Sequence, residues 1–228
     1  MRAIALLALL SCAALALSLP DLERARDRQD RATLQRLAGD AAAAAEKQPK
    51  NAEAQYQYAL AQSFVAEVAT ELKDKDQAHS AAEAGIKAAE KAVELDGKRA
   101  ENYRILGTLC GQAVPGNILA AFKYGRCALD NMNKAVQLDP NSAAAYLGRG
   151  VGYYYLPPQF GGGTDNAIKD LQKAVELSPK DADAWLWLGI ALRKANRNAD
   201  AHDALAKSVQ LNPARIWAKQ QLEKTPAK

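Results

Sequence analysis

The side chains that most often carry out chemistry are spread along this sequence and form no recognisable group. His79 and His202 lie far apart, and neither belongs to an H-x3-H pair or to a Cys/His cluster of the kind that binds zinc. No Ser-His-acid set is suggested, although such triads can assemble from distant positions. We therefore expect no metal, no cofactor and no catalytic residues; an enzyme with an unfamiliar site is the alternative.

A run of three glycines at residues 161–163 could cradle a phosphate ahead of a helix that begins near Thr164. The run lacks the Gly-Lys-Ser/Thr ending of a P-loop, and no strand precedes it. A flexible turn between two helices explains it more simply, with Thr164 or Asp165 as the helix N-cap. Phe160, between a proline pair and the glycines, could be displayed as a contact residue.

The chain contains three cysteines, of which Cys110 and Cys127 lie on either side of one expected interhelical turn. In an oxidising compartment these two could form a disulfide; otherwise they are two small apolar residues of the core. Both interpretations stay open, because an error of one residue in the helix register would direct the sulfurs apart.

The first 18 residues have the order of segments found in secretory signal peptides. Arg2 supplies a positive charge, an apolar run extends from Ala3 to Leu10, and small residues precede Ser18. The run is too short to span a membrane, and the rest of the chain has no apolar run long enough to do so. We expect cleavage near Ser18 and export to the periplasm or the exterior.

The third cysteine, Cys12, offers an alternative mode of processing. Leu9-Leu10-Ser11-Cys12 resembles a bacterial lipobox, in which the cysteine is lipidated after cleavage. The other interpretation is that Cys12 is a small apolar residue within the signal peptide. Lipid anchoring through Cys12 is therefore the alternative to release into the periplasm.

The composition is that of a soluble, helical protein. Hydrophobic residues make up 49% of the 228 residues and charged residues 25%, which excludes collagen-like, mucin-like and wholly disordered chains. Thirty Lys and Arg against 26 Asp and Glu give a net charge of +4, too small to indicate nucleic-acid binding. Long Ala-rich stretches and only 6% aromatic residues favour helix over sheet.

A repeated pattern organises most of the chain. Four segments share a small residue, Val, an acid or amide, Leu, a polar residue and a final Pro or Gly, namely residues 92–97, 135–140, 174–179 and 208–213. A fainter copy ends at Pro49. The spacing between copies shortens along the chain, and the last two end at Pro179 and Pro213, which are 34 residues apart.

Within these units, further residues follow the motif W-x2-L-G-x2-Y and a second-helix pattern of small residues. The last unit matches at Trp185, Leu188, Gly189, Leu192, Ala201, Leu205, Ser208 and Pro213. The preceding unit matches at Tyr146, Gly150, Tyr153, Ala167, Leu171, Ala174 and Pro179. The unit before it matches at Tyr103, Leu106, Gly107, Ala128, Met132 and Ala135, and the first unit is degenerate.

The chain therefore resembles the tetratricopeptide repeat (TPR) family from about residue 52 to residue 213. Its elongated hairpins resemble an exported bacterial branch of such proteins and, more loosely, the regulators of microtubule dynamics. The resemblance implies an all-α fold, a right-handed TPR superhelix (α-solenoid) of about four helix-turn-helix hairpins with flanking helices. The expected boundaries are 1–18 for the signal peptide, 19–50 for an N-terminal helical extension, 51–213 for the repeat domain (51–97, 98–140, 141–179 and 180–213) and 214–228 for a C-terminal capping helix and tail.

The residues in excess of the standard repeat length fall between the two helices of each unit. In the first unit the extra segment, residues 66–79, favours helix, so both helices should be longer than usual. In the second it contains a turn at residues 114–117 and a longer second helix, and in the third it is a loop at residues 156–164. The N-terminal extension should cover the open face of the first unit, and residues 214–224 should cap the last.

We expect a non-enzymatic, exported scaffold that holds a protein or peptide segment in its concave groove; the partner's identity and the oligomeric state are left open. The alternatives are a carrier of a small apolar ligand in the same groove and a lipid-anchored envelope assembly factor. The TPR resemblance implies that ligands contact the first helix of each unit. Mapped onto this chain, the ligand positions are Tyr56, Leu60, Phe64, Arg104, Thr108, Leu147, Val151, Tyr154, Tyr155, Leu186, Ile190, Arg193 and Lys194. Most are apolar or aromatic, which favours an apolar peptide segment over a carboxylate clamp; packing between units is the other interpretation.

Overall fold

The structure of the protein is a computed structural model that describes residues 17–114 and 118–226. The expected signal peptide, apart from its last two residues, and the possible lipidation site Cys12 lie outside the described residues. The side chain of Phe160 is also outside the described part, so its expected display as a contact residue is not tested.

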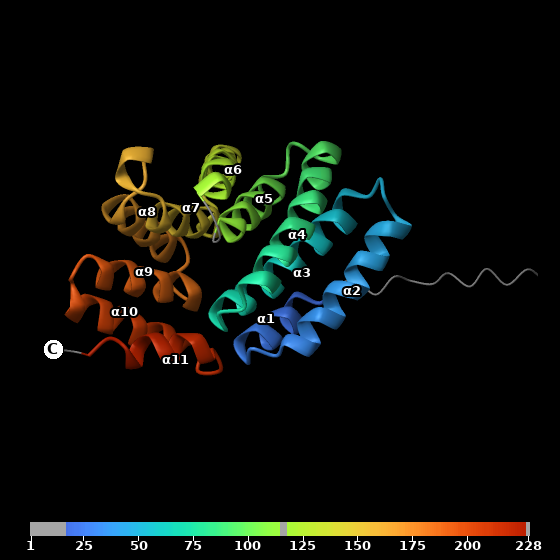
Figure 1. Cartoon of the computed structure of the whole chain (residues 1–228). Coiled ribbons are helices and arrows are strands. Elements are labelled where there is room, and N and C mark those ends of the chain that lie inside the picture. Colours follow the sequence, from blue (N-terminus) through green and yellow to red (C-terminus); the bar gives the residue numbers. More distant parts are fainter. Residues whose placement is uncertain (1–16, 115–117, 227–228) are drawn as a thin grey trace, which may run out of the picture.

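The described residues form an all-helical superhelix and contain no strand (Figure 1). The helices are α1 (Leu19–Asp27), α2 (Arg31–Lys47), α3 (Ala52–Glu71), α4 (Lys75–Leu95), α5 (Ala100–Ala113), α6 (Ile118–Leu138), α7 (Ala143–Tyr155), α8 (Thr164–Leu177), α9 (Ala182–Lys194), α10 (Asn198–Leu211) and α11 (Ile216–Glu223). The most extensive packing joins α3 to α4, α5 to α6, α7 to α8 and α9 to α10. Four helical hairpins with flanking helices were expected, and this architecture confirms that fold class.

Polar residues ahead of the helices fix where several of them begin. The side chain of Asn51 accepts hydrogen bonds from the backbone N–H groups of Glu53 and Ala54, and Asp181 caps α9 in the same way. A side-chain oxygen at this position satisfies N–H groups that have no partner within the helix. For α8 the sequence interpretation was wrong, because Gly163 precedes the helix and no side chain caps it.

The paired helices approach closely where the repeat motif has small residues. A Cβ atom added to Gly189 would lie 2.6 Å from Leu205 Cγ and 3.0 Å from the carbonyl oxygen of Ala201. Gly150 in α7 is equally confined, since the same atom would lie 2.7 Å from Leu171 Cγ in α8. These glycines therefore permit a contact between helices that any larger residue would force apart.

Lengthening of the hairpins follows the expected pattern. α3 has 20 residues and α4 has 21, and α6 extends for 21 residues from Ile118. Between α7 and α8 the chain instead forms a loop that contains one 3-10 turn, Pro158–Phe160. In the Ala-rich first hairpin the extra residues therefore lengthen both helices. The segment between α7 and α8 contains proline and glycine, which cannot extend a helix, so its extra residues form a loop.

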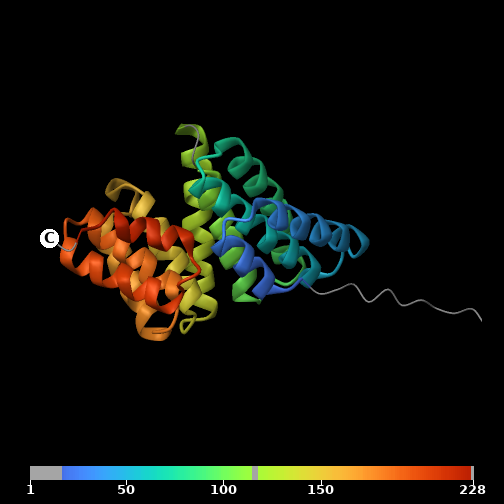
Figure 2. The same ribbon diagram turned by 90° about the horizontal axis from the view of Figure 1, so that it is seen from below.

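The two ends of the superhelix lie side by side. α2 packs on α3, and α11 packs on α10 and α9, so each end of the array is covered by a flanking helix. Figure 1 shows α1 close to α11, and Figure 2 shows the N-terminal and C-terminal helices as two groups on either side of α6. An Arg26–Asp183 ion pair of 2.7 Å joins α1 to α9 across this space.

Candidate functional site

The candidate site is the inner surface formed by the first helix of each hairpin. α3 carries Tyr56, Leu60 and Phe64; α5 carries Arg104 and Thr108; α7 carries Leu147, Val151, Tyr154 and Tyr155; and α9 carries Leu186, Ile190, Arg193 and Lys194. All of the expected ligand positions thus lie on four first helices, but their accessibility differs sharply from one helix to the next.

On α3 the aromatic side chains are covered. Tyr56 is 9% exposed and Phe64 is 8% exposed, and both belong to the main hydrophobic core, against which Leu60 packs. The guanidinium carbon of Arg99 lies 4.3 Å from the centre of the Tyr56 ring, and that of Arg26 lies 5.4 Å from the Phe64 ring. Cation–π contacts of this kind shield a ring from a ligand.

On α5 the polar positions are engaged within the protein. Arg104 Nε donates a hydrogen bond of 2.7 Å to Glu101, and the Thr108 hydroxyl donates to the backbone oxygen of Arg104. Tyr56 donates its hydroxyl proton to the same Glu101 carboxylate, at 3.3 Å. The Glu101 carboxylate raises the pKa of Arg104 in spite of its burial. Arg104 is therefore an internal ion-pair partner, which agrees with the view that a carboxylate clamp is incomplete.

At the end of α7 four aromatic rings form an accessible cluster, which we call the aromatic patch: Tyr154, Tyr155, Trp187 and Trp217. The ring centres of Tyr154 and Tyr155 are 4.9 Å apart, and each lies about 6 Å from the centre of the Trp187 ring in an edge-to-face arrangement. Trp217, from α11, lies 5.3 Å from Trp187. Tyr155 is 62% exposed, so the patch combines a packed base with a rim open to solvent.

Lys194 lies against this patch, where its Nζ donates a hydrogen bond of 2.6 Å to the backbone oxygen of Tyr154. The same Nζ is 4.2 Å from the centre of the Tyr154 ring. Of the two other expected α7 residues, Leu147 packs against the core of the C-terminal hairpins and Val151 is half-buried. The C-terminal half thus brings Tyr154, Tyr155 and Lys194 together.

Three expected α9 positions have a structural role instead. Leu186 is fully buried and Ile190 is 4% exposed, in a core with Leu205 and Ala218. Arg193 donates hydrogen bonds to the backbone and side-chain oxygens of Gln221 and to the Thr225 hydroxyl. These three residues do not lie on an open surface in this structure, because α11 and the segment after it pack on this part of α9.

The sequence reasoning missed Trp187 and Trp217. Trp187 lies two residues after the motif residue Trp185, between two expected ligand positions, and it contacts both tyrosines of the patch. Trp217 was assigned to the terminal cap alone, although its ring also completes the patch. Their spacing in the sequence could have indicated them. Trp187 lies on the first helix of the last hairpin, α9, and Trp217 lies on α11, which packs on α9.

Two hollows in the described surface lie away from the expected groove. One has a volume of about 150 Å³ and includes Thr70, His79 and Gln112, whereas the other, of about 420 Å³, includes Trp185, Leu188 and Leu192. Neither contains one of the 13 expected ligand positions. Among the described residues no group of three or more His, Cys, Asp or Glu side chains could hold a metal ion. No helix in the described ranges is long and apolar enough to cross a bilayer.

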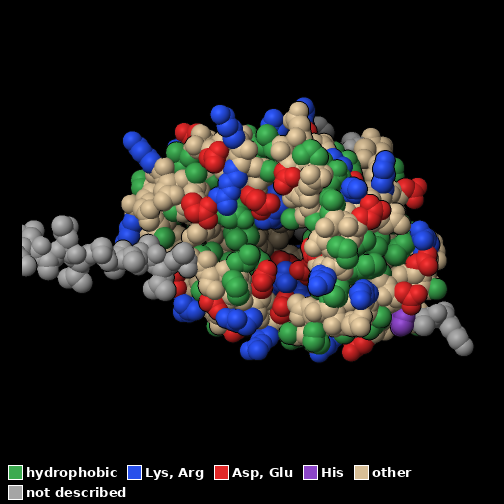
Figure 3. Space-filling model, turned by 180° about the vertical axis from the view of Figure 1, so that it is seen from behind, with side chains coloured by type: hydrophobic (Ala, Val, Ile, Leu, Met, Phe, Trp, Pro, Cys, Tyr) green, Lys and Arg blue, Asp and Glu red, His purple; other side chains and the backbone are tan. Residues whose placement is uncertain are grey.

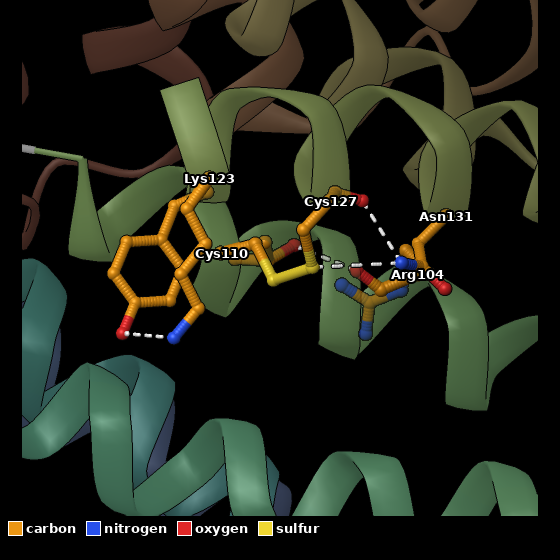
Figure 4. The surroundings of a disulfide bond; sticks show 7 residues. Arg104, Cys110, Lys123, Cys127 and Asn131 are labelled. Atoms are coloured by element: carbon orange, nitrogen blue, oxygen red, sulfur yellow. Dashed lines mark hydrogen bonds between the residues drawn. A yellow bond between two sulfur atoms is a disulfide. The ribbon is translucent and has the colours of Figure 1, made fainter. Parts of the chain in front are cut away.

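A disulfide joins Cys110 in α5 to Cys127 in α6, with their Cα atoms 5.9 Å apart (Figure 4). Cys110 is fully buried, and Asn131 donates a hydrogen bond of 2.9 Å to the backbone oxygen of Cys127 one turn earlier in α6. The bond links the two helices of the second hairpin and is flanked by Arg104 in the view of Figure 4. The hairpin thus positions both sulfurs for the bond, which the spacing alone left open.

Comparison with solved structures identifies the fold. The thermophilic TPR protein TTC0263 of Thermus thermophilus superposes with a TM-score of 0.64 at 17% identity, covering 85% of this chain and 91% of that one. The match to YrrB, a TPR protein with an unusual peptide-binding site, has a TM-score of 0.47 at 20% identity, covering 90% of this chain and 91% of that one. No curated protein sequence matches the chain.

Two family models match the sequence. Residues 161–195 match a TPR repeat model, in agreement with the hairpins of the C-terminal half. Residues 21–155, more than half of the chain, match the model described as regulator of microtubule dynamics protein 1-3. This protein therefore belongs to the regulator of microtubule dynamics protein 1-3 family, with a superhelix built of TPRs.

Proposed function

We propose that the protein is an exported, non-enzymatic scaffold that binds an apolar or aromatic segment of a protein partner on the aromatic patch. The TPR fold supports a protein-interaction scaffold in general. The observation that carries the specific proposal is Tyr155, which is 62% exposed beside three further aromatic rings. Large exposed aromatic side chains on a packed base are typical of positions that dominate binding energy.

The geometry of the patch favours a segment with apolar side chains. Tyr154 and Trp187 supply a preformed base, so that a partner side chain placed against Tyr155 would remove apolar surface from water with little rearrangement. Lys194, held at the edge by the backbone oxygen of Tyr154, could orient the segment through one carbonyl group or carboxylate. Most of the affinity would then come from the rings and little from charge, which predicts weak dependence on salt.

The alternatives have less support. A carrier of a small apolar ligand needs an enclosed apolar cavity, and the hollows described above lie away from the aromatic patch. A lipid-anchored assembly factor would use the same patch and differ only in the processing of Cys12. An enzyme would need free polar groups that converge in the groove, whereas Arg104 and Arg193 of the expected groove are held by internal partners.

Export is supported by the order of segments before Ser18 and by a disulfide in the second hairpin, because disulfides persist mainly in oxidising compartments. Mass spectrometry of the protein isolated from its native cells tests this. A mature chain that begins near Leu19 supports release, a chain that begins at a lipidated Cys12 supports anchoring, and an intact Met1 contradicts export.

Site-specific photo-crosslinking tests the binding proposal. A photoreactive phenylalanine analogue replaces Tyr155 in one variant and Lys173, an exposed residue of the second helix α8, in a matched control. We expect a defined partner to be crosslinked in native cells from position 155 and not from position 173. Capture that is equal at the two positions, or that disappears with modest salt, would contradict the assignment of the aromatic patch.

A second candidate function follows from the family match over residues 21–155, since the family description names the regulation of microtubule dynamics. Microtubule association can be measured directly by co-sedimentation of the purified protein with polymerised tubulin. Binding that survives Tyr155→Ala would place the contact elsewhere on the molecule, and the absence of binding would remove this candidate.

A further inference from the structure

Charged side chains join the first and last parts of the superhelix, which are far apart in the sequence. We call them the ionic cluster: Arg26 and Asp27 of α1, Glu67 and Glu71 of α3, Asp183 of α9, and Arg215, which immediately precedes α11. Seen from behind, acidic and basic side chains gather around a hollow near the middle of the molecule (Figure 3). In a solenoid each repeat normally contacts only its neighbours, so contacts between the two ends are unusual.

Arg215 is the centre of this cluster and is only 1% exposed. Its Nη2 donates a 2.7 Å hydrogen bond to Glu67 Oε1 and a second bond to Glu71, while its Nη1 lies 3.1 Å from Glu71 Oε2. Its Nε lies within 3.7 Å of carboxylate oxygens of Asp27 and Asp183. A residue near the C-terminus is thus held by carboxylates of the first hairpin and of α1.

Arg26 completes the connection from the opposite end. Its Nη1 donates a 2.7 Å hydrogen bond to Asp183 Oδ2, and its Nη2 lies 2.9 Å from Asp27 Oδ1. The Asn212 side chain donates a 2.7 Å hydrogen bond to the other oxygen of Asp27. Each end of the superhelix therefore supplies both a guanidinium group and carboxylates.

These side chains span a gap that the backbones do not close. Within the described part of the chain, the extensive helix contacts connect neighbours in the array, and none joins α1, α2 or α3 to α9, α10 or α11. The closure therefore depends on charged side chains and not on an apolar interface. Such an interface can open without exposing a hydrophobic core, because the core of each half stays intact.

The cluster is also short of positive charge, with four carboxylates facing two guanidinium groups. Burial, together with the nearby carboxylates of Glu71 and Asp183, raises the pKa of Glu67 to about 7, in spite of the opposing effect of Arg26 and Arg215. The closed arrangement therefore contains repulsion as well as attraction, and its balance can be shifted by a change of charge.

The same short segment connects the ionic cluster with the aromatic patch. Arg215 occupies the N-cap position of α11, and Trp217 follows two residues later. The Arg215 guanidinium carbon lies 5.6 Å from the centre of the Trp217 ring, which in turn packs against Trp187 at 5.3 Å. A displacement of Arg215 from its carboxylates would therefore move a ring of the patch.

We infer that the ionic cluster is a latch that closes the superhelix end to end, and that its opening changes the aromatic patch through Trp217. The second part of this inference rests on the proposed function of the patch, whereas the first part does not. By thermodynamic linkage, a partner that binds the patch better in the open state promotes opening of the latch, and a change that opens the latch strengthens binding by the same factor.

Small-angle X-ray scattering of the full chain tests the latch without any partner. In Arg215→Leu the radius of gyration should increase, because the carboxylates of the cluster then repel one another without their central cation. Arg197→Leu is the matched control, since Arg197, at the N-cap of α10, forms an exposed ion pair with Asp200. We expect no change in that variant. An Arg215→Leu protein that is helical and as compact as the unchanged protein would overturn the latch.

A milder variant keeps the test decisive if Arg215→Leu does not fold. Arg26→Gln removes one of the two guanidinium groups, at a side chain that is 11% exposed, and leaves the four carboxylates of the cluster facing Arg215 alone. Expansion of this variant supports the latch, and an unchanged radius in a variant that remains helical overturns it.

Tryptophan fluorescence tests the coupling to the aromatic patch. Opening of the latch by Arg215→Leu or by Arg26→Gln should shift the emission of the protein, and Trp217→Phe should abolish most of that shift. Expansion without a change in emission would overturn the coupling and leave the latch in place. The absence of a crosslinked partner at position 155, in a protein whose radius and emission respond as expected, would contradict the proposed function. It would leave the latch in place.

Discussion

The aromatic side chains of the inner helices differ in their exposure to solvent between the N-terminal and C-terminal halves of the superhelix. In the first hairpin Tyr56 and Phe64 are buried, and arginines from neighbouring segments lie over their rings. In the third and fourth hairpins Tyr155 protrudes into solvent from a packed aromatic base. The same repeat position can therefore supply core in one half and exposed aromatic surface in the other, and the neighbouring elements decide which.

A large effect on stability should come from the disulfide of the second hairpin, which lies in the N-terminal half. Cys110 and Cys127 are 17 residues apart, and closing a loop of that length stabilises a protein by about 3 kcal/mol. We expect the double variant Cys110→Ala, Cys127→Ala to lose about that amount in urea unfolding. Reduction with dithiothreitol should destabilise the unchanged protein and leave the variant unaffected. An unfolding midpoint that does not respond to dithiothreitol would show that the bond does not contribute.

The next largest effect belongs to the close helix contact of the last hairpin. Gly189→Trp would place a bulky ring where even a Cβ atom comes within 2.6 Å of Leu205 Cγ, and we expect a loss of about 2 kcal/mol or more. Gly39→Ala is the matched control, because no atom lies within 4 Å of the added Cβ in that helix. It should be neutral or slightly stabilising. Equal unfolding temperatures for the two variants would contradict the role of the glycine.

Glu67 should make stability depend on pH. The charged groups that act on it are Arg26 of α1, Glu71 of α3, Asp183 of α9, and Arg215. Its pKa rises from 4.5 to about 7 on folding, so the folded protein binds the proton more tightly than the unfolded chain. The stabilisation associated with protonated Glu67 is therefore complete below pH 4.5 and is lost as the pH rises through about 7.

The expected loss from Glu67 is on the order of 1–2 kcal/mol, smaller than the full pKa change would give because the side chain is partly exposed. Urea unfolding at several pH values between about 5 and 8 measures it. Glu67→Gln should remove most of this dependence, whereas Glu46→Gln, at an exposed position of α2, should preserve it. Stability that rises over this range in the unchanged protein and in Glu46→Gln alike would contradict the raised pKa.

The fold could be predicted from the sequence because its determinants are local. Gly150 and Gly189 mark the close contacts, Pro179 follows the end of a helix, and residues 156–164 cannot continue one, and each of these effects acts within one hairpin. The N-cap of α8 was the exception. Thr164 and Asp165 have suitable side chains, but Gly163, with a φ of 109°, takes that position instead.

The candidate site could be predicted only in part, because accessibility depends on segments distant in sequence. The repeat pattern placed Tyr154, Tyr155 and Lys194 on one inner surface, where the structure also has them. It could not indicate that α11 covers Leu186, nor that Arg215 lies against Glu71, 144 residues earlier. Those contacts arise from the curvature of the whole superhelix, to which every hairpin contributes, and a motif confined to one hairpin carries no information about them.

The sharpest comparison of the two halves concerns a pair of tyrosines, of which Tyr155 should give the smallest effect on stability. Tyr56→Ala should destabilise the protein by about 3 kcal/mol or more, because it removes a ring from the main core. Tyr155→Ala should change stability by less than about 0.5 kcal/mol, since most of that side chain is already in water.

For partner capture the order of the two variants should be reversed, so that Tyr155→Ala has a larger effect than Tyr56→Ala. If Tyr155 contributes as aromatic residues at the centre of interfaces do, its removal costs about 2 kcal/mol of binding free energy, roughly a thirtyfold loss of affinity. The measurement is capture of the crosslinked partner by each purified variant whose helical content matches that of the unchanged protein. Tyr155→Phe is the control that retains the ring, and it should bind nearly as well as the unchanged protein. If Tyr155→Ala keeps full affinity, the exposed ring is not the binding surface, and the difference between the two halves concerns packing alone.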